Sequence, residues 1–224
     1  MPVSFNRLGP FYRLQRRLGL LTDTDLMAGR RALLFVALAW LPAVLLALSQ
    51  GLALNDQHER ALLLDYNVYA IALAITAFVL MEQASDKRMA WLVSQFVAQG
   101  IVRDSAREGF ARARQNVERR TGWPWMEALI LVAAYLMAWV WLQYGAALIE
   151  SGTWFARMVD GAVRPTWAGW WAVGVSLPLF WFLLGRWVWR FVTWGLMLRD
   201  IARCDLRLVA THADRCGGIA FIGE

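Results

Sequence analysis

The sequence predicts an all-α, polytopic helical membrane protein with four transmembrane helices and a cytoplasmic helical segment between the second and the third. The chain has 224 residues, 59% hydrophobic and 18% charged, whereas a soluble domain of this length carries about a quarter charged residues. The apolar residues lie in blocks of about 20, the length that crosses about 30 Å of hydrocarbon. We expect these blocks to form a single membrane domain over residues 1–224.

The positive charge of the chain favours membrane partners over nucleic acid. The net charge is +6 and comes mainly from arginines clustered at the ends of apolar runs, which fits topology and anionic lipid. The expected partners are therefore the lipid bilayer and its anionic lipid headgroups, and nucleic acid is not expected. The two cysteines, Cys204 and Cys216, do not make a disulfide framework, and no cofactor is expected.

The N-terminal arm, residues 1–31, is basic, with six arginines against two aspartates. Apolar residues recur in it every three or four positions: Leu8, Phe11, Leu14, Leu18 and Leu21. This spacing fits an amphipathic helix on the membrane surface, and a loosely ordered basic arm is equally compatible. The arm lacks the long apolar core of a cleavable signal peptide, so we expect the first span to act as an uncleaved signal anchor.

The first two spans are predicted at about residues 32–54 and 62–81. The first carries no charge and contains Pro42, which a membrane helix tolerates as a kink. The second carries Asp65, Tyr66 and Asn67 at its outer end. These polar residues are expected to anchor the span at the interface or, alternatively, to line the mouth of a cavity.

A long polar segment, residues 82–122, separates the second and third spans. It holds eight basic and five acidic residues. Apolar residues follow one face of a helix in it: Met89, Leu92, Val93, Phe96, Val97 and Ile101. We expect one or two helices, broken at Gly100 or Gly109, that either extend the neighbouring spans into the cytoplasm or lie on the bilayer surface.

The last two spans are predicted at about residues 125–149 and 167–189, with a short loop over 150–166. Glu127 lies near the start of the third span, where an interfacial position is expected. The fourth apolar run continues to Leu198. A helix of that length extends about 48 Å, well beyond the hydrocarbon core. Another part of the protein must therefore cover the apolar stretch 187–198, and the segment 87–120 is a candidate.

The distribution of arginines predicts the orientation. The N-terminal arm holds six basic residues and the 82–122 segment eight, whereas the two short loops on the opposite side hold one and two. The positive-inside rule then places both termini and the 82–122 segment in the cytoplasm. The expected location is the bacterial inner (plasma) membrane, with several passes.

Arg186 and Arg190 lie one helical turn apart in the fourth apolar run. They are expected to lie at the cytoplasmic interface and to reach lipid phosphates there. Alternatively, they turn toward the bundle interior and bind an anionic ligand or a lipid headgroup with paired hydrogen bonds.

The cytoplasmic tail, residues 199–224, begins as a predicted helix of alternating charge through Arg207. It continues into a polar motif that contains His212, Asp214, Arg215, Gly217 and Gly218. The glycine pair is expected to end the helix and allow a tight turn. His212 and Asp214 are expected to bond the backbone of that turn, because their spacing matches no strong zinc pattern; we predict no metal site.

This tail, H-x-D-R-x-G-G, resembles a motif in uncharacterised bacterial multi-pass membrane proteins. The resemblance covers about the last 20 residues and implies no activity. In those proteins further apolar segments follow the motif, whereas this sequence stops soon after it. The early stop is compatible with a truncated form or a fragment of a longer protein, and the sequence alone does not decide it.

The expected function is that of a non-catalytic scaffold, sensor or assembly subunit, with a second copy or a membrane protein as partner. The sequence has no P-loop, HExxH or GxSxG motif and no predicted catalytic residue. One alternative is an oligomeric anion channel or transporter lined by Arg186 and Arg190. Another is a membrane enzyme acting on a phosphorylated lipid, with these arginines on phosphate and His212 and Asp214 as an acid–base pair.

Overall fold

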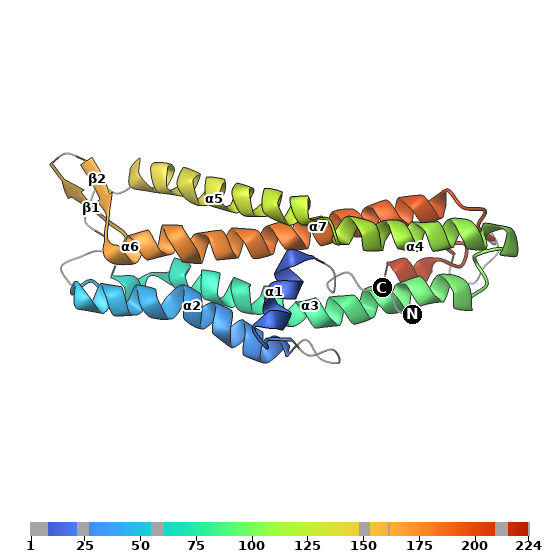
Figure 1. The fold of residues 1–224 in the computed structure, drawn as a ribbon, viewed down its shortest axis with the longest axis horizontal. Helices are drawn as coiled ribbons and strands as arrows, with labels where there is room; N and C mark the ends of the chain where they lie inside the picture. The colour runs from blue at the N-terminus through green and yellow to red at the C-terminus, as the bar shows by residue number, and fades with distance from the viewer. Residues whose placement is uncertain are drawn as a thin grey trace. The chain divides into compact units, whose positions relative to one another are not determined.

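The fold is mostly helical, and four of its helices are long and apolar enough to span a membrane. The computed structural model describes residues 9–21, 27–54, 61–147, 153–160, 162–208 and 215–223. Figure 1 shows its helices: α1 (Pro10–Arg17), α2 (Ala28–Ser49), α3 (Tyr66–Ala98), α4 (Arg107–Thr121), α5 (Pro124–Ala147), α6 (Trp167–Trp171) and α7 (Leu177–Ala202). Short helical turns are η1 (Leu62–Leu64), η2 (Asp104–Ala106), the π-helical η3 (Ala172–Ser176) and η4 (Ala220–Ile222).

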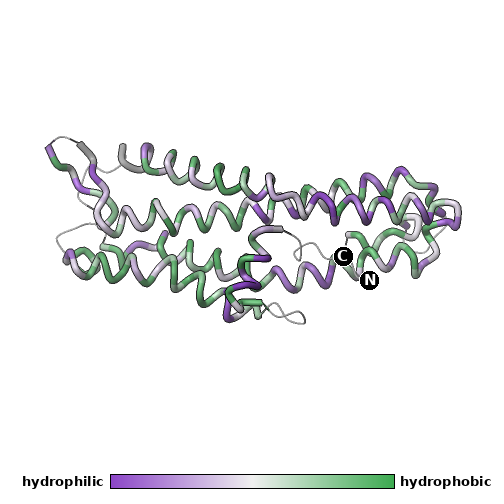
Figure 2. Tube along the Cα trace, viewed as in Figure 1, coloured by the Kyte–Doolittle hydropathy of each residue, from purple (hydrophilic) through white to green (hydrophobic). Residues whose placement is uncertain are grey.

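The described residues form two compact units. Unit 1 comprises residues 1–21, 81–124 and 188–224, and unit 2 comprises residues 22–80 and 125–187. Helices α3 and α7 contribute residues to both units. Figure 2 shows that α2 and the first half of α3 are largely hydrophobic, whereas α4 is largely hydrophilic.

The first candidate span ends at Ser49, five residues before the predicted boundary, because Gly51 reverses the chain. Gly51 has φ 69°, a left-handed conformation that glycine adopts without strain. Its amide donates to the Leu48 carbonyl at 3.1 Å, and the Leu52 amide donates to the Ala47 carbonyl at 2.8 Å. This pair of bonds is the Schellman arrangement, which satisfies the last carbonyls of α2.

A hairpin joins α5 to α6, where the sequence analysis predicted a loop. Strands β1 (Ala156–Val159) and β2 (Ala162–Pro165) pair antiparallel, with Ala156 opposite Pro165. The sequence carried a signal for it, since Asp-Gly at positions 160 and 161 is typical of tight hairpins. The all-α prediction is therefore correct for the spans and incomplete at this connection.

Thr166 and Gly169 fix the start of α6 against the hairpin. The Thr166 hydroxyl oxygen accepts a hydrogen bond from the Gly169 amide at 3.0 Å, capping the helix, and the hydroxyl donates to the Trp154 carbonyl at 2.5 Å. A Cβ on Gly169 would lie 2.0 Å from the Phe155 carbonyl oxygen. Position 169 therefore requires glycine for close approach of the two backbones.

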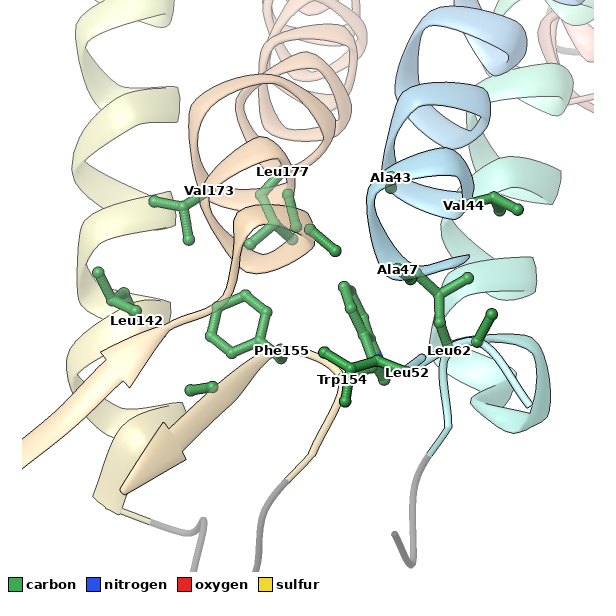
Figure 3. Close-up of a cluster of buried hydrophobic side chains, with 14 of the residues drawn as sticks. Ala43, Val44, Ala47, Leu52, Leu62, Leu142, Trp154, Phe155, Val173 and Leu177 are labelled. Atoms are coloured by element: carbon green, nitrogen blue, oxygen red, sulfur yellow. The ribbon is translucent and has the colours of Figure 1, made fainter. Parts of the chain in front are cut away.

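The core of unit 2 combines small residues with two aromatic rings. Figure 3 shows Trp154 on the side of Leu52 and Leu62, and Phe155 on the side of Leu142 and Val173. The rings of Trp154 and Phe155 meet edge to face, with centroids 5.7 Å apart. Buried alanines of α2, α5 and α6 let the helices approach closely here: Ala43, Ala47, Ala138 and Ala168.

Two prolines interrupt the helical hydrogen bonds of unit 2. Pro42 lies inside α2, and Pro178 follows the π-helical turn η3 at the start of α7. A proline has no amide hydrogen for the carbonyl four residues earlier. Side chains from other elements bond the carbonyls near Pro42: the Trp171 indole donates to Leu38 at 3.1 Å and the Ser176 hydroxyl to Ala39 at 2.6 Å.

The core of unit 1 confirms the helical stripe predicted between the second and third spans. Four stripe residues of α3 are buried: Met89, Leu92, Val93 and Phe96. They pack with Phe110, Ala113 and Val117 of α4 and with Met197 and Ile201 of α7. The prediction that the segment 87–120 covers the end of the fourth apolar run is therefore confirmed. Val97 is the exception in the stripe, with 61% of its surface exposed.

The break between α3 and α4 occurs at Gly100, one of the two predicted positions. Gly100 has φ 66°, and α3 ends at Ala98. Gly109, the other candidate, lies inside α4. In the N-terminal arm the predicted helix forms as α1, and Leu14 and Leu18 are exposed by 52% and 63%.

The predicted alternating-charge helix of the tail is wrong beyond Ala202, where α7 ends. The chain instead runs beside the α3–α4 connection. Leu206 pairs with Val102 in an isolated antiparallel bridge, and the Arg207 amide donates to the Ile101 carbonyl at 2.7 Å. This backbone pairing with residues more than 100 positions earlier replaces helical hydrogen bonds, and a local charge pattern cannot report it.

Candidate functional site

Arg186 of α7 forms an ion pair with Glu127 near the start of α5, in unit 2. The guanidinium nitrogen and the carboxylate oxygen are 2.5 Å apart, and the two side chains are 15% and 12% exposed. The guanidinium also lies 6.0 Å from the ring centroid of Phe182. The positive charge of Arg186 is therefore held against a carboxylate of the same unit.

Arg190 forms the corresponding ion pair in unit 1, with Asp86 of α3. The two atoms are 2.9 Å apart, and the side chains are 5% and 15% exposed. Removing one member of such a pair leaves an uncompensated charge, which typically costs about 3–5 kcal/mol. An anion at either arginine would have to compete with a protein carboxylate.

A third ion pair connects α7 with α4 in unit 1. Arg120 and Asp200 are 3.1 Å apart, with side chains 23% and 20% exposed. Nearby in the same unit the indole rings of Trp123 and Trp189 stack with centroids 6.5 Å apart. Each of the three pairs thus joins α7 to a different helix.

Sequence reasoning placed Arg186 and Arg190 together but missed their partners. Glu127 was expected at the interface, and Asp86 was counted among the charges of the polar segment. The position of these residues along the predicted spans was the signal that could have paired them. In helices of alternating direction, the predicted inner ends of spans two, three and four lie on the same side of the membrane. Both acids and both arginines are close to those inner ends.

The tail motif is described from Arg215 onward; His212 and Asp214 lie outside the described residues. Arg215 is exposed and has φ 55°, and Gly217 and Gly218 have φ 70° and 96°. The predicted tight turn is therefore confirmed, but the glycine pair does not end the fourth helix, because α7 ends at Ala202. The turn leads into η4, whose Phe221 meets Phe96 edge to face at 5.2 Å and is buried in the core of unit 1.

A cavity lies within unit 2, with about 70 Å³ open to the centres of water-sized molecules. Asp65 and Asn67 line it, as in the alternative that placed these residues at a cavity mouth. The Asp65 carboxylate accepts hydrogen bonds from the Trp154 indole at 2.9 Å and from the Asn67 amide and side chain at 2.9 and 3.0 Å.

A basic groove of about 760 Å³ lies within unit 1. Its arginines come from three segments: Arg103 before η2, Arg107 and Arg114 of α4, and Arg207 of the tail. Val97 and Phe110 contribute apolar surface, and Asp104 contributes one acid. The Val102–Leu206 bridge holds the tail beside the α3–α4 connection and so brings Arg207 to this groove.

Within the described part of the chain, no three His, Cys, Asp or Glu side chains are grouped closely enough to hold a metal ion. No family model, curated protein or solved structure matches the chain.

Proposed function

We propose that this chain is a non-catalytic multi-pass protein of the bacterial inner (plasma) membrane that recruits an acidic partner protein to the basic groove of unit 1. The groove is the observation that carries the proposal. It is a concave surface with four arginines and one aspartate, and it contains Val97, an apolar residue that is 61% exposed. Apolar contact at the centre and arginines around it are typical of protein interfaces.

The ion pairs around the groove favour exchange with a partner's carboxylates. Arg107 and Asp104 are 2.7 Å apart with side chains 77% and 88% exposed, and Arg103 and Asp205 are 3.5 Å apart with side chains 54% and 58% exposed. Exposed pairs of this kind contribute at most about 1 kcal/mol. A partner that presents several carboxylates therefore displaces them at little cost and gains the charge of the whole groove.

The distribution of charge supports a cytoplasmic position for unit 1 and for both termini. Unit 1 contains 17 of the 23 Lys and Arg residues of the chain. Four helices with alternating direction, Ala28–Ser49, Tyr66–Ala98, Pro124–Tyr144 and Trp167–Ala202, are the candidate spans. The positive-inside rule then orients these spans with unit 1 on the cytoplasmic side.

The neutralised arginines favour this assembly role over the two alternatives. An anion path or a phosphate site built on Arg186 and Arg190 requires guanidiniums available to the anion. Each of these guanidiniums instead lies within 2.9 Å of a carboxylate.

The test compares two charge-reversal variants of α4 in the tagged, full-length protein. Arg107→Glu with Arg114→Glu changes the groove; Arg112→Glu with Arg119→Glu makes the same change of charge at α4 residues that do not line it. After crosslinking in membranes and purification, a partner recovered with the wild type and the control is expected to be lost with the groove variant. Equal recovery with both variants, or equal loss, would refute recruitment by the groove.

A further inference from the structure

We infer that the cavity of unit 2 is a binding site for a small alkylammonium ligand, an inference that does not rest on partner recruitment by unit 1. The walls of the cavity are aromatic and aliphatic, and they include Trp40, Trp141, Trp154 and Phe155. Asp65 is the one charged residue among the described lining residues. An aromatic cage with a single carboxylate is the arrangement that recognises organic cations, because ring faces and carboxylate both attract positive charge.

The aromatic rings of this cage are fixed by one another. Trp141 and Phe155 meet edge to face with centroids 4.8 Å apart, and Trp154 meets Phe155 in the same way. Figure 3 shows Trp154 and Phe155 between the strands of the hairpin and the helices of unit 2. A cage whose rings are already in place loses little side-chain freedom when a ligand enters it.

Hydrogen bonds orient the Asp65 carboxylate, and none of their donors carries a positive charge. One oxygen accepts from the backbone and side-chain amides of Asn67, and the other accepts from the Trp154 indole. All three donors are uncharged groups. These hydrogen bonds therefore bring no positive charge to the carboxylate, which attracts a cation and disfavours both an anion and the end of an acyl chain.

The cavity exists because small residues flank the two interruptions of the helices. Ala39 and Ala43 lie on either side of Pro42 in α2, and Ala172 and Ser176 begin and end the π-helical turn η3. A water molecule needs about 10–15 Å³ of such space. The space of about 70 Å³ takes a ligand several times larger, which fits an ammonium group with a short apolar body.

Trp40 supplies a further contact for the ligand. Its indole Nε1 is buried and has no hydrogen-bond partner among the described residues, and Trp40 lines the cavity. A buried donor left in this state is costly unless a ligand or water satisfies it. The ligand that fits best carries a hydrogen-bond acceptor beside its ammonium group, as the hydroxyl of choline or ethanolamine does.

The experiment measures binding by calorimetry of the full-length protein in nanodiscs of phosphatidylglycerol. The probes are choline and dimethylbutanol, its neutral carbon isostere. Choline is expected to bind the wild-type protein. Dimethylbutanol is expected to bind the wild type at least about tenfold more weakly, and choline is expected to bind the Asp65→Asn variant at least about tenfold more weakly. The matched control, Asp160→Asn, changes an exposed aspartate that does not line the cavity and is expected to bind choline normally.

Two further comparisons test the contact from Trp40 and the source of the ammonium group. Trp40→Phe is expected to weaken the binding of choline more than that of tetramethylammonium. Both ligands lose part of the attraction of the indole ring, but only choline has an acceptor for the Trp40 Nε1–H. Nanodiscs of phosphatidylethanolamine distinguish the sources of the ammonium group: lower apparent affinity for choline there indicates that the lipid headgroup occupies the site, and unchanged affinity indicates a free ligand. No choline binding to the folded wild type, equal binding of the neutral isostere, or normal binding by Asp65→Asn would overturn the inference.

Discussion

The indole Nε1 of Trp171 donates a hydrogen bond to the carbonyl oxygen of Leu38 at 3.1 Å, and Leu38 lies four residues before Pro42. In an uninterrupted helix the amide of residue 42 would bond this carbonyl, but proline has none. The Tyr135 hydroxyl bears the same relation to Pro178, because it donates to the Gly174 carbonyl at 3.3 Å. Both prolines are thus accommodated by donors from neighbouring helices, which is how proline is tolerated in membrane helices.

A double-mutant cycle tests the bond between Trp171 and Leu38. Trp171→Phe is expected to lower the free energy of unfolding by about 1–2 kcal/mol, because it leaves the carbonyl without a donor and loses some packing. In a Pro42→Ala background, where the new amide bonds Leu38, the hydrogen-bond part of this loss should disappear. Unfolding in detergent, followed by circular dichroism, measures all four proteins. Equal losses in both backgrounds would rule out the bond as a contributor.

The Arg190–Asp86 pair predicts a strong dependence of stability on both partners. Arg190→Gln is expected to destabilise the protein by about 3 kcal/mol, because it removes the positive charge that lies 2.9 Å from the mostly buried Asp86 carboxylate. Adding Asp86→Asn should recover most of this loss. Thermal unfolding of the single and double variants checks it, with Arg112→Gln in the exposed pair with Glu108 as a control expected to change stability by about 0.5 kcal/mol or less. A double variant as unstable as Arg190→Gln would contradict this account.

The Arg186–Glu127 pair predicts that the protein does not conduct anions through these residues. Proteoliposomes that contain the wild type are expected to show the chloride flux of empty liposomes, and Arg186→Gln should leave it unchanged. A fluorescent chloride indicator inside the vesicles provides the measurement. Flux in the wild type that Arg186→Gln abolishes would instead favour the channel alternative.

Gly169 predicts a large local effect of one methyl group. Gly169→Ala is expected to destabilise the protein by about 3 kcal/mol or more, because the new Cβ would meet the Phe155 carbonyl oxygen at 2.0 Å and force the hairpin away from α6. Gly174→Ala is the control, since a Cβ there meets nothing within 4 Å. Comparing their midpoints of thermal unfolding tests the contact; similar midpoints for the two variants would exclude it.

The elements that sequence reasoning predicted are those with a local signal. Apolar blocks marked the four candidate spans, and the spacing of Met89, Leu92, Val93 and Phe96 predicted the buried face of α3. Val97 belongs to the same pattern but lies at the edge of the stripe, where the groove of unit 1 leaves it exposed. Periodicity identifies a helix face, and the neighbouring elements decide how wide the buried part of that face is.

The features that sequence reasoning missed depend on contacts between distant segments. The helix predicted for the tail is wrong because Leu206 pairs with Val102, and no residue between 199 and 207 indicates this pairing. To predict the partners of Arg186 and Arg190, one would have to compare the positions of residues along three helices. To predict the cavity, one would have to know where Pro42 and η3 lie relative to the hairpin. Local propensity carries no information about any of these arrangements.

The side-chain donors at Pro42 and Pro178 give specificity to the pairing of the helices. A membrane offers little hydrophobic discrimination between one helix–helix register and another, because lipid tails are as apolar as the side chains. A slip of one turn, about 5.4 Å, would separate Trp171 from Leu38, Ser176 from Ala39 and Tyr135 from Gly174. The slip would leave the Leu38 and Gly174 carbonyls without these donors, so the bonds favour one neighbour and one register for each helix.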